Sequence, residues 1–161
     1  MKRLLTVALT VIVALTMTLG TSVCAYGASS KDALELEATT AILIDAKTGE
    51  ILFSKNKDVQ LTPASMTKIM TALLAIENLD MDTVVTIDDE TPYTEGNIIY
   101  MHKGEKFTVE QLLKAMLVTS ANDCAVALAK TMSGTIKDFS NLMNGKAKEL
   151  GAKNTNFVNP N

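Results

Sequence analysis

The chain has 161 residues and a net charge of −3, with one histidine and two cysteines. This length suits one domain of ordinary size or part of a larger one. The negative charge argues against nucleic acid as a partner, because binding phosphates requires a basic surface. A single histidine without a Cys/His cluster argues against a bound metal, and nothing in the sequence indicates a cofactor.

The first 27 residues have the pattern of a signal peptide. Lys2 and Arg3 precede an apolar run over 4–19, and small residues suited to cleavage follow it. We therefore expect an extracytoplasmic protein of the cell envelope, secreted or membrane-associated. An uncleaved anchor is the alternative, although the run is shorter than the ~20 residues of a membrane span. Without the positive charges of Lys2 and Arg3, the net charge of −3 becomes −5 for residues 28–161. Cys124 is then the one remaining cysteine, and we expect it to be a small buried apolar residue.

Two predicted strands follow. Residues 40–45 form an apolar run that predicts a buried strand, and residues 50–54 predict a second strand. The connection, 46–49, ends in a glycine and has the length of a tight turn. The pattern predicts a β-hairpin.

Residues 62–78 predict the central helix. Thr62 is a suitable N-cap for it. Ser65 and Lys68 lie one turn apart, so a neutral lysine there can take the proton of the serine hydroxyl. The alternative is a serine of the capping region beside a solvated lysine. An apolar face at helical spacing supports the helix: Met66, Ile69, Met70, Leu73 and Leu74.

The second half of the chain predicts short strands at 83–87 and 98–101, followed by His102, which we expect to be a surface residue without a role. Three helices come next, with readable starts and ends. Their starts are Thr108, Ser120 and Thr135; the last two end at Gly134 and Gly151, and Leu142 and Leu150 are expected to face inward. Residues 154–161 form a polar extended segment.

A short polar break, 118–122, joins the first two of these helices. One interpretation is that the break lets Ser120 and Asn122 point into a cleft. The other is plain helix capping, which serine and asparagine both favour.

Taken together, Ser65-Met66-Thr67-Lys68 and Ser120-Ala121-Asn122 resemble the S-x-x-K and S-x-N motifs of penicillin-binding proteins and serine β-lactamases. The closer similarity is to the D-alanyl-D-alanine carboxypeptidases among the low-molecular-mass penicillin-binding proteins. This resemblance covers essentially all of the chain after the signal peptide. The stretches that carry it are 45–52, 63–68, 120–123 and 154–160.

The resemblance implies an α/β (α+β) fold of the β-lactamase/transpeptidase-like type, with a helical cluster on an antiparallel sheet. It implies that Ser65 attacks the bond between the two terminal D-alanines of a peptidoglycan stem peptide, with Lys68 as the base. Ser120 would relay protons to the leaving amine, and Asn122 would bind the substrate amide and position Lys68. β-Lactam antibiotics would act as covalent inhibitors that acylate the nucleophile.

The sequence departs from this family pattern at its third motif, K-T-G, which should follow S-x-N. The only such triplet, Lys47-Thr48-Gly49, precedes the nucleophile and lies in the predicted hairpin turn. We therefore expect residues 28–161 to be the N-terminal part of the catalytic domain, truncated before the K-T-G strand and inactive alone. A membrane anchor at a missing C-terminus would explain membrane association.

Two other functions remain open at this point. A serine β-lactamase is expected to read Ser-Asp-Asn where this chain has Ser120-Ala121-Asn122. A non-catalytic peptidoglycan-binding relative would keep the fold without the reaction, and an intact Ser65 and Lys68 argue against it.

Overall fold

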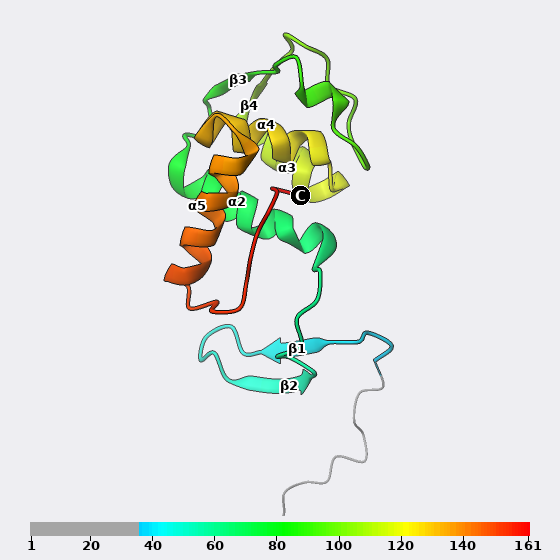
Figure 1. The fold of residues 1–161 in the computed structure, drawn as a ribbon, viewed down its shortest axis with the longest axis vertical. Coiled ribbons are helices and arrows are strands. Elements are labelled where there is room, and N and C mark those ends of the chain that lie inside the picture. The colour runs from blue at the N-terminus through cyan, green and yellow to red at the C-terminus, as the bar shows by residue number, and fades with distance from the viewer. Residues whose placement is uncertain (1–35) are drawn as a thin grey trace, which may run out of the picture. The chain divides into compact units, whose positions relative to one another are not determined.

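The computed structural model describes residues 36–161. The predicted signal peptide, residues 1–27, lies outside the described residues and stays a prediction. The described residues form two compact parts, 36–57 and 58–161 (Figure 1). In the described part of the chain, no helix combines the length and the apolar character needed to span a membrane.

The first part contains the predicted hairpin. Strand β1 (Ala41–Ile44) pairs antiparallel with β2 (Ile51–Lys55). In the turn, a carboxylate oxygen of Asp45 accepts hydrogen bonds from the backbone N–H groups of Lys47 and Thr48 at 2.9 and 2.8 Å. Gly49 has a φ of +74°, which glycine adopts without steric cost. The Lys-Thr-Gly triplet is therefore part of a turn, as predicted.

The prediction that the first strand is buried was wrong. Ile42, Leu43 and Ile44 are each more than half exposed. The two strands form a sheet of their own, and burying an apolar strand requires a second layer packed on its face. The apolar run thus identified a strand correctly and its burial incorrectly.

The second part is a cluster of α-helices with a small sheet. Its helices are α2 (Thr67–Asn78), α3 (Val109–Thr119), α4 (Asn122–Ser133) and α5 (Ile136–Glu149). Strands β3 (Val84–Thr86) and β4 (Lys106–Thr108) pair antiparallel. Helices and antiparallel pairs together make the described residues an α+β structure, as predicted.

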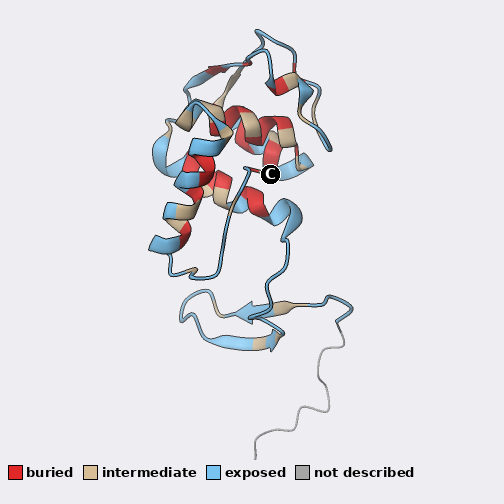
Figure 2. Ribbon diagram, in the orientation of Figure 1, coloured by how far each residue is buried: buried red, intermediate tan, exposed pale blue. Residues whose placement is uncertain are grey.

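Helix α4 lies at the centre of the cluster and contacts α2, α3 and α5. Small residues let the neighbouring helices approach it closely, and Figure 2 shows buried residues concentrated in these helices. Phe139 and Met143 of α5 pack with Leu74 of α2 in a second cluster. The buried residues of α4 are Asp123, Cys124, Ala125, Ala127, Leu128 and Ala129.

Local capping signals were confirmed at two of the helix starts. The Thr108 side chain accepts from the backbone of Gln111, whose side chain accepts from the backbone of Thr108, so the predicted capping box is present. The Thr135 hydroxyl accepts from the backbone of Asp138. Gly134 ends α4 as predicted.

The strand predicted at 98–101 is absent, and β4 lies further along the chain at Lys106–Thr108. The backbone N–H groups of Ile99 and Met101 donate to the carboxylate of Asp123, at 3.1 and 3.5 Å. They are therefore satisfied by a side chain instead of a neighbouring strand, and the apolar run at 98–101 was misleading.

Several residues expected in the core are exposed in this chain. Met66 and Ile69 are 65% and 64% exposed, and Leu142 and Leu150 are also exposed. The buried face of α2 is instead rich in small and polar residues. Those buried residues are Thr67, Lys68, Thr71, Ala72, Leu74 and Ala75. Helical periodicity indicated the helix, but not which of its faces packs against α4.

The segment predicted as polar and extended, 154–161, has neither helix nor strand and packs on the helices. The Asn144 side chain donates to the carbonyl of Phe157 and accepts from its N–H, at 2.8 and 2.7 Å. The Thr71 hydroxyl donates to the carbonyl of Pro160 at 2.6 Å. These bonds replace the backbone pairing that regular structure would have supplied.

Candidate active site

Ser65 lies in a single 3₁₀ turn, η1 (Ala64–Met66), immediately before α2. The predicted helix start was wrong in this respect: Thr62 does not cap the helix, and α2 begins at Thr67. Ala64 has a φ of +49°, which an α-helix cannot contain. The backbone turn therefore precedes the serine and leaves Ser65 exposed.

Lys68, in the first turn of α2, is only 3% exposed. Its Nζ lies 3.3 Å from the Oγ of Ser65 and donates to the Oδ1 of Asn122 at 2.7 Å. Within residues 36–161 it forms no ion pair, and burial lowers its pKa. A lysine with neutral partners and a lowered pKa is suited to act as a base.

Asn122, the first residue of α4, is held from two sides. Its side-chain Nδ2 donates to the carbonyl of Glu95 at 2.8 Å, and its backbone N–H donates to the carbonyl of Asn97 at 2.7 Å. The Asn97 side chain in turn donates to the carbonyl of Thr119. Because Nδ2 is occupied by Glu95, the Oδ1 of Asn122 faces Lys68, which fixes the orientation of the amide.

Ser120 ends α3 in a left-handed conformation, with a φ of 60°. The sequence had indicated that the second helix starts at Ser120. This prediction was wrong, because α4 starts at Asn122. In the described part of the chain, the buried Oγ of Ser120 has no hydrogen-bond partner. A buried polar atom without a partner is rare in proteins, and such sites concentrate where function requires them.

The structure thus places Lys68 in contact with both Ser65 and Asn122, whereas the Oγ of Ser120 forms no hydrogen bond to them. Sequence reasoning missed two neighbours of this group. Asp123 is 1% exposed, and an acidic residue inside an alanine-rich helix was the available signal. Gly96 has no side chain to signal a role, yet a Cβ at this position would lie 2.6 Å from Nδ2 of Asn122.

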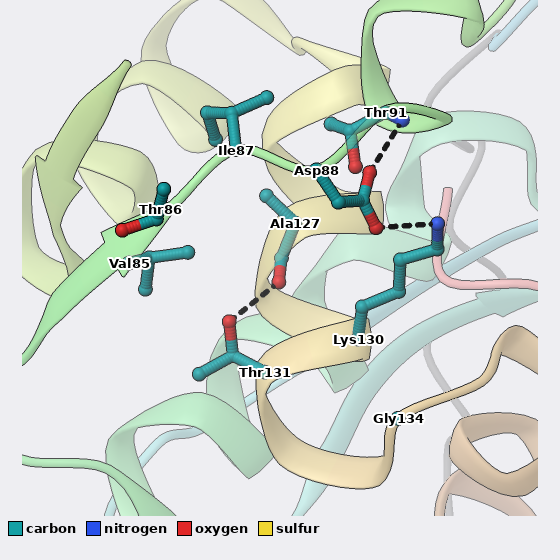
Figure 3. A pocket seen from close by; sticks show the side chains of 9 residues that line it. All are labelled: Val85, Thr86, Ile87, Asp88, Thr91, Ala127, Lys130, Thr131 and Gly134. Carbon is teal, nitrogen blue, oxygen red and sulfur yellow. Dashed lines mark hydrogen bonds and ion pairs between the residues drawn. The ribbon is translucent and has the colours of Figure 1, made fainter. Parts of the chain in front are cut away.

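A pocket of about 240 Å³ lies elsewhere in the helical part, between β3 and α4 (Figure 3). The Nζ of Lys130 bridges Asp88 and Glu90 beside it, at 2.7 and 2.6 Å. Burial opposes ionisation of Asp88, but hydrogen bonds from Lys130 and Thr91 outweigh it and lower the pKa of Asp88 to about 2. The pocket is lined by Val85, Thr86, Ile87, Asp88, Thr91, Ala127, Lys130, Thr131 and Gly134, and none of these is a predicted site residue.

Two other chemistry-bearing residues lie where predicted, one on the surface and one in the core. His102 is exposed and lies 3.7 Å from a carboxylate oxygen of Glu105. Cys124 is fully buried, and burial together with the charge of Asp123 raises the pKa of its thiol to about 12, so it is not a nucleophile. Among residues 36–161, no group of acidic, histidine or cysteine side chains could hold a metal.

Comparisons with known proteins show which family the chain resembles. The sequence model of the D-alanyl-D-alanine carboxypeptidase family, peptidase family S11, matches residues 27–161. The chain is 42% identical over 165 residues to the D-alanyl-D-alanine carboxypeptidase DacF of Bacillus subtilis, covering 99% of this chain and 42% of the relative. The chain therefore spans less than half of that relative's length.

Two solved structures show the same fold. The D-alanyl-D-alanine carboxypeptidase DacD of Francisella tularensis matches with a TM-score of 0.76 and 41% identity, over 80% of this chain and 32% of that one. Penicillin-binding protein D2 of Listeria monocytogenes, solved in an ampicillin-bound form, matches with a TM-score of 0.69 and 32% identity, over 79% and 53% of the two chains. These similarities confirm the predicted fold class and family resemblance.

Proposed function

Because this chain belongs to the D-alanyl-D-alanine carboxypeptidase family, we propose that it supplies the nucleophile and general base of a serine-type carboxypeptidase. The proposed substrate is a peptidoglycan stem peptide ending in D-Ala-D-Ala, from which the terminal D-alanine is removed. Since the chain spans 42% of its Bacillus subtilis relative, the activity is proposed for the protein that carries this chain. The observation that supports the proposal most strongly is the contact between Ser65 and the buried amine of Lys68.

The first chemical step is acylation of Ser65. Neutral Lys68 takes the hydroxyl proton as Oγ forms a bond to the carbonyl carbon between the two D-alanines. The 3.3 Å separation of Nζ and Oγ is close to hydrogen-bonding range, and such contacts tighten in the substrate complex. The tetrahedral oxyanion collapses, the C–N bond breaks, and a proton passes to the leaving amine. The backbone N–H of Ser65 contributes to stabilising the oxyanion.

Ser120 and Asn122 support this step. The unpartnered Oγ of Ser120 is available to relay a proton between Lys68 and the leaving amine. Asn122 positions Lys68 through its Oδ1 and binds the substrate's amide. Water then hydrolyses the acyl-enzyme, which returns Ser65 to its starting state.

β-Lactams are proposed to acylate the same serine and to be released slowly. A relative, penicillin-binding protein D2 of Listeria monocytogenes, was solved with ampicillin bound. Fast hydrolysis of bound penicillin would instead favour a serine β-lactamase. Because the substrate is part of the cell wall, we also propose that the protein is exported, with residues 1–27 as the signal peptide.

The experiment that tests the proposal is labelling with a fluorescent penicillin, followed by peptide mass mapping. The protein that carries this chain is compared with its Ser65→Ala variant. Ser54→Ala serves as the matched control, because Ser54 is an exposed serine of β2. We expect a stable adduct on Ser65 in the wild type and the control, and none in Ser65→Ala.

Two results would count against the proposal. An adduct that persists in Ser65→Ala would assign the nucleophile to another residue. A folded wild-type protein without any adduct would favour a non-catalytic peptidoglycan-binding relative, with Ser65 and Lys68 reduced to structural roles.

A further inference from the structure

We propose that residues 95–101 act as a clamp that sets the orientation of Asn122, and that Asp123 and Gly96 are its positioning residues. The proposal rests on the function proposed above, because a clamp on Asn122 affects the reaction only if Lys68 serves Ser65. Neither positioning residue contacts the reacting atoms. Asp123 binds the backbone of Ile99 and Met101, and Gly96 lies against the amide of Asn122.

The buried carboxylate of Asp123 anchors one end of the clamp. It accepts from the backbone N–H of Ile99 at 3.1 Å and from that of Met101 at 3.5 Å, and its other oxygen accepts from the N–H of Cys124 at 2.9 Å. Burying a carboxylate is costly unless hydrogen bonds compensate for lost water. The side chain, 1% exposed, thus depends on the clamp for its partners, and the clamp depends on it.

The backbone between the two anchored amides is in a conformation that it would not adopt alone. Tyr100 has a φ of 60°, although its side chain is 77% exposed. A bulky residue rarely adopts a left-handed conformation, and it persists when the surroundings hold the backbone on both sides. The bonds of Asp123 to Ile99 and Met101 hold it in this way, so the path of the segment is determined by Asp123.

The other end of the clamp holds Asn122. The carbonyl of Glu95 accepts from its side chain, and the carbonyl of Asn97 accepts from its backbone N–H. Gly96 lies between these two carbonyls with a φ of +88°, and a Cβ there would lie 2.6 Å from Nδ2 of Asn122. Only glycine therefore lets the backbone lie directly against the amide and fix its rotamer.

The consequence concerns Lys68. With Nδ2 of Asn122 held by the clamp, Oδ1 is directed to Nζ of Lys68 at 2.7 Å. If the clamp loosens, the amide can rotate, and Lys68 loses the Oδ1 acceptor that the clamp holds in place. The base then no longer sits in a single position relative to the nucleophile.

The primary test uses Asp123→Asn in the protein that carries this chain. The amide keeps one acceptor oxygen but presents an NH₂ group to a second N–H donor, so at least one anchor is lost. Asp138→Asn is the matched control, because Asp138 is also an acidic residue in the first turn of a helix, α5, but is exposed. The measured quantities are the rate of acylation by penicillin as a function of pH, and unfolding in urea.

We expect Asp123→Asn to slow acylation by about tenfold or more. Without the Oδ1 acceptor the charged lysine is less favoured, so the rise of the rate with pH should move to lower pH. A purely structural role would leave the pH profile in place. Asp138→Asn should match the wild type in both rate and profile.

Gly96→Ala is the second variant. If Asp123→Asn does not fold, the test of the clamp rests on Gly96→Ala alone. Gly96 is exposed, and the added methyl group displaces the Asn122 amide without touching Asp123. We expect the same loss of rate and the same shift in the pH profile. Folded variants that react at the wild-type rate and pH profile, in a protein whose Ser65 is labelled, would overturn the clamp and leave the proposed function intact. A wild type without any label on Ser65 would overturn the proposed function itself.

Discussion

Two lysines of the helical part have little exposure and opposite environments. Lys68 is 3% exposed, and within residues 36–161 the hydrogen-bond partners of its amine are the neutral Ser65 and Asn122. The side chain of Lys130, in the last turn of α4, is 17% exposed and contacts two carboxylates, Asp88 and Glu90. Burial lowers the pKa of Lys68; it acts in the same direction on Lys130, but the hydrogen bonds to the carboxylates outweigh it and raise that pKa.

The difference shows that burial alone does not make a lysine a base. Carboxylate partners stabilise the ammonium form and leave no free pair of electrons at neutral pH, whereas neutral acceptors do not repay the cost of desolvating the charge. Lys130 lines the pocket of Figure 3, but its charge is paired with two carboxylates. Charge and hydrogen bonding, and not the presence of this pocket, therefore locate the candidate active site.

The largest expected effect is a difference in acylation rate between variants of the two lysines. Lys68→Met removes the proposed base, so the acylation rate with a fluorescent penicillin should fall by roughly 10²–10⁴-fold. Lys130→Met makes the same chemical change away from the site, so its acylation rate should stay close to that of the wild type. Equal losses in the two variants would show that the lysines are not functionally distinct.

A smaller effect is expected on the free energy of unfolding of the same two variants. Lys68→Met replaces a buried amine with an apolar side chain of similar length, which should raise the free energy of unfolding by about 1 kcal/mol. Lys130→Met leaves Asp88 and Glu90 without their cation, and since both carboxylates are partly exposed the loss should be about 1 kcal/mol. Urea denaturation at neutral pH measures both changes, and shifts of the same sign would contradict the comparison.

The smallest effect concerns acid pH. The pKa of Asp88 is about 2 in the folded chain and 3.8 in its ordinary environment. As the pH falls below 3.8, the unfolded chain takes up a proton that folded Asp88 does not, so its stabilising contribution is lost progressively down to about pH 2. Asp88→Asn should show a shallower loss of thermal stability over this range. Identical curves for the wild type and Asp88→Asn would mean that Lys130 contributes nothing through this carboxylate.

Features that depend on neighbours along the chain could be predicted from the sequence. The hairpin turn at Asp45–Gly49, the capping box at Thr108 and the stop at Gly134 are set by side chains within a few residues of the backbone they satisfy. The same holds for the pairing of Ser65 with Lys68, because three residues make one turn whether the turn is α or 3₁₀. These short-range interactions could therefore be predicted from the order of the residues.

The buried face of α2 and the partners of the two lysines, in contrast, depend on how distant segments pack. Asn122 lies 54 residues from Lys68 and Asp88 lies 42 residues from Lys130, so neither contact has a local signature. Residues 98–101 form an apolar run that predicted a strand, yet the buried carboxylate of Asp123 accepts hydrogen bonds from the N–H groups of Ile99 and Met101. Periodicity records where apolar side chains repeat. Whether a given lysine is left with neutral acceptors or paired with carboxylates depends on how distant segments pack, and that choice sets its protonation.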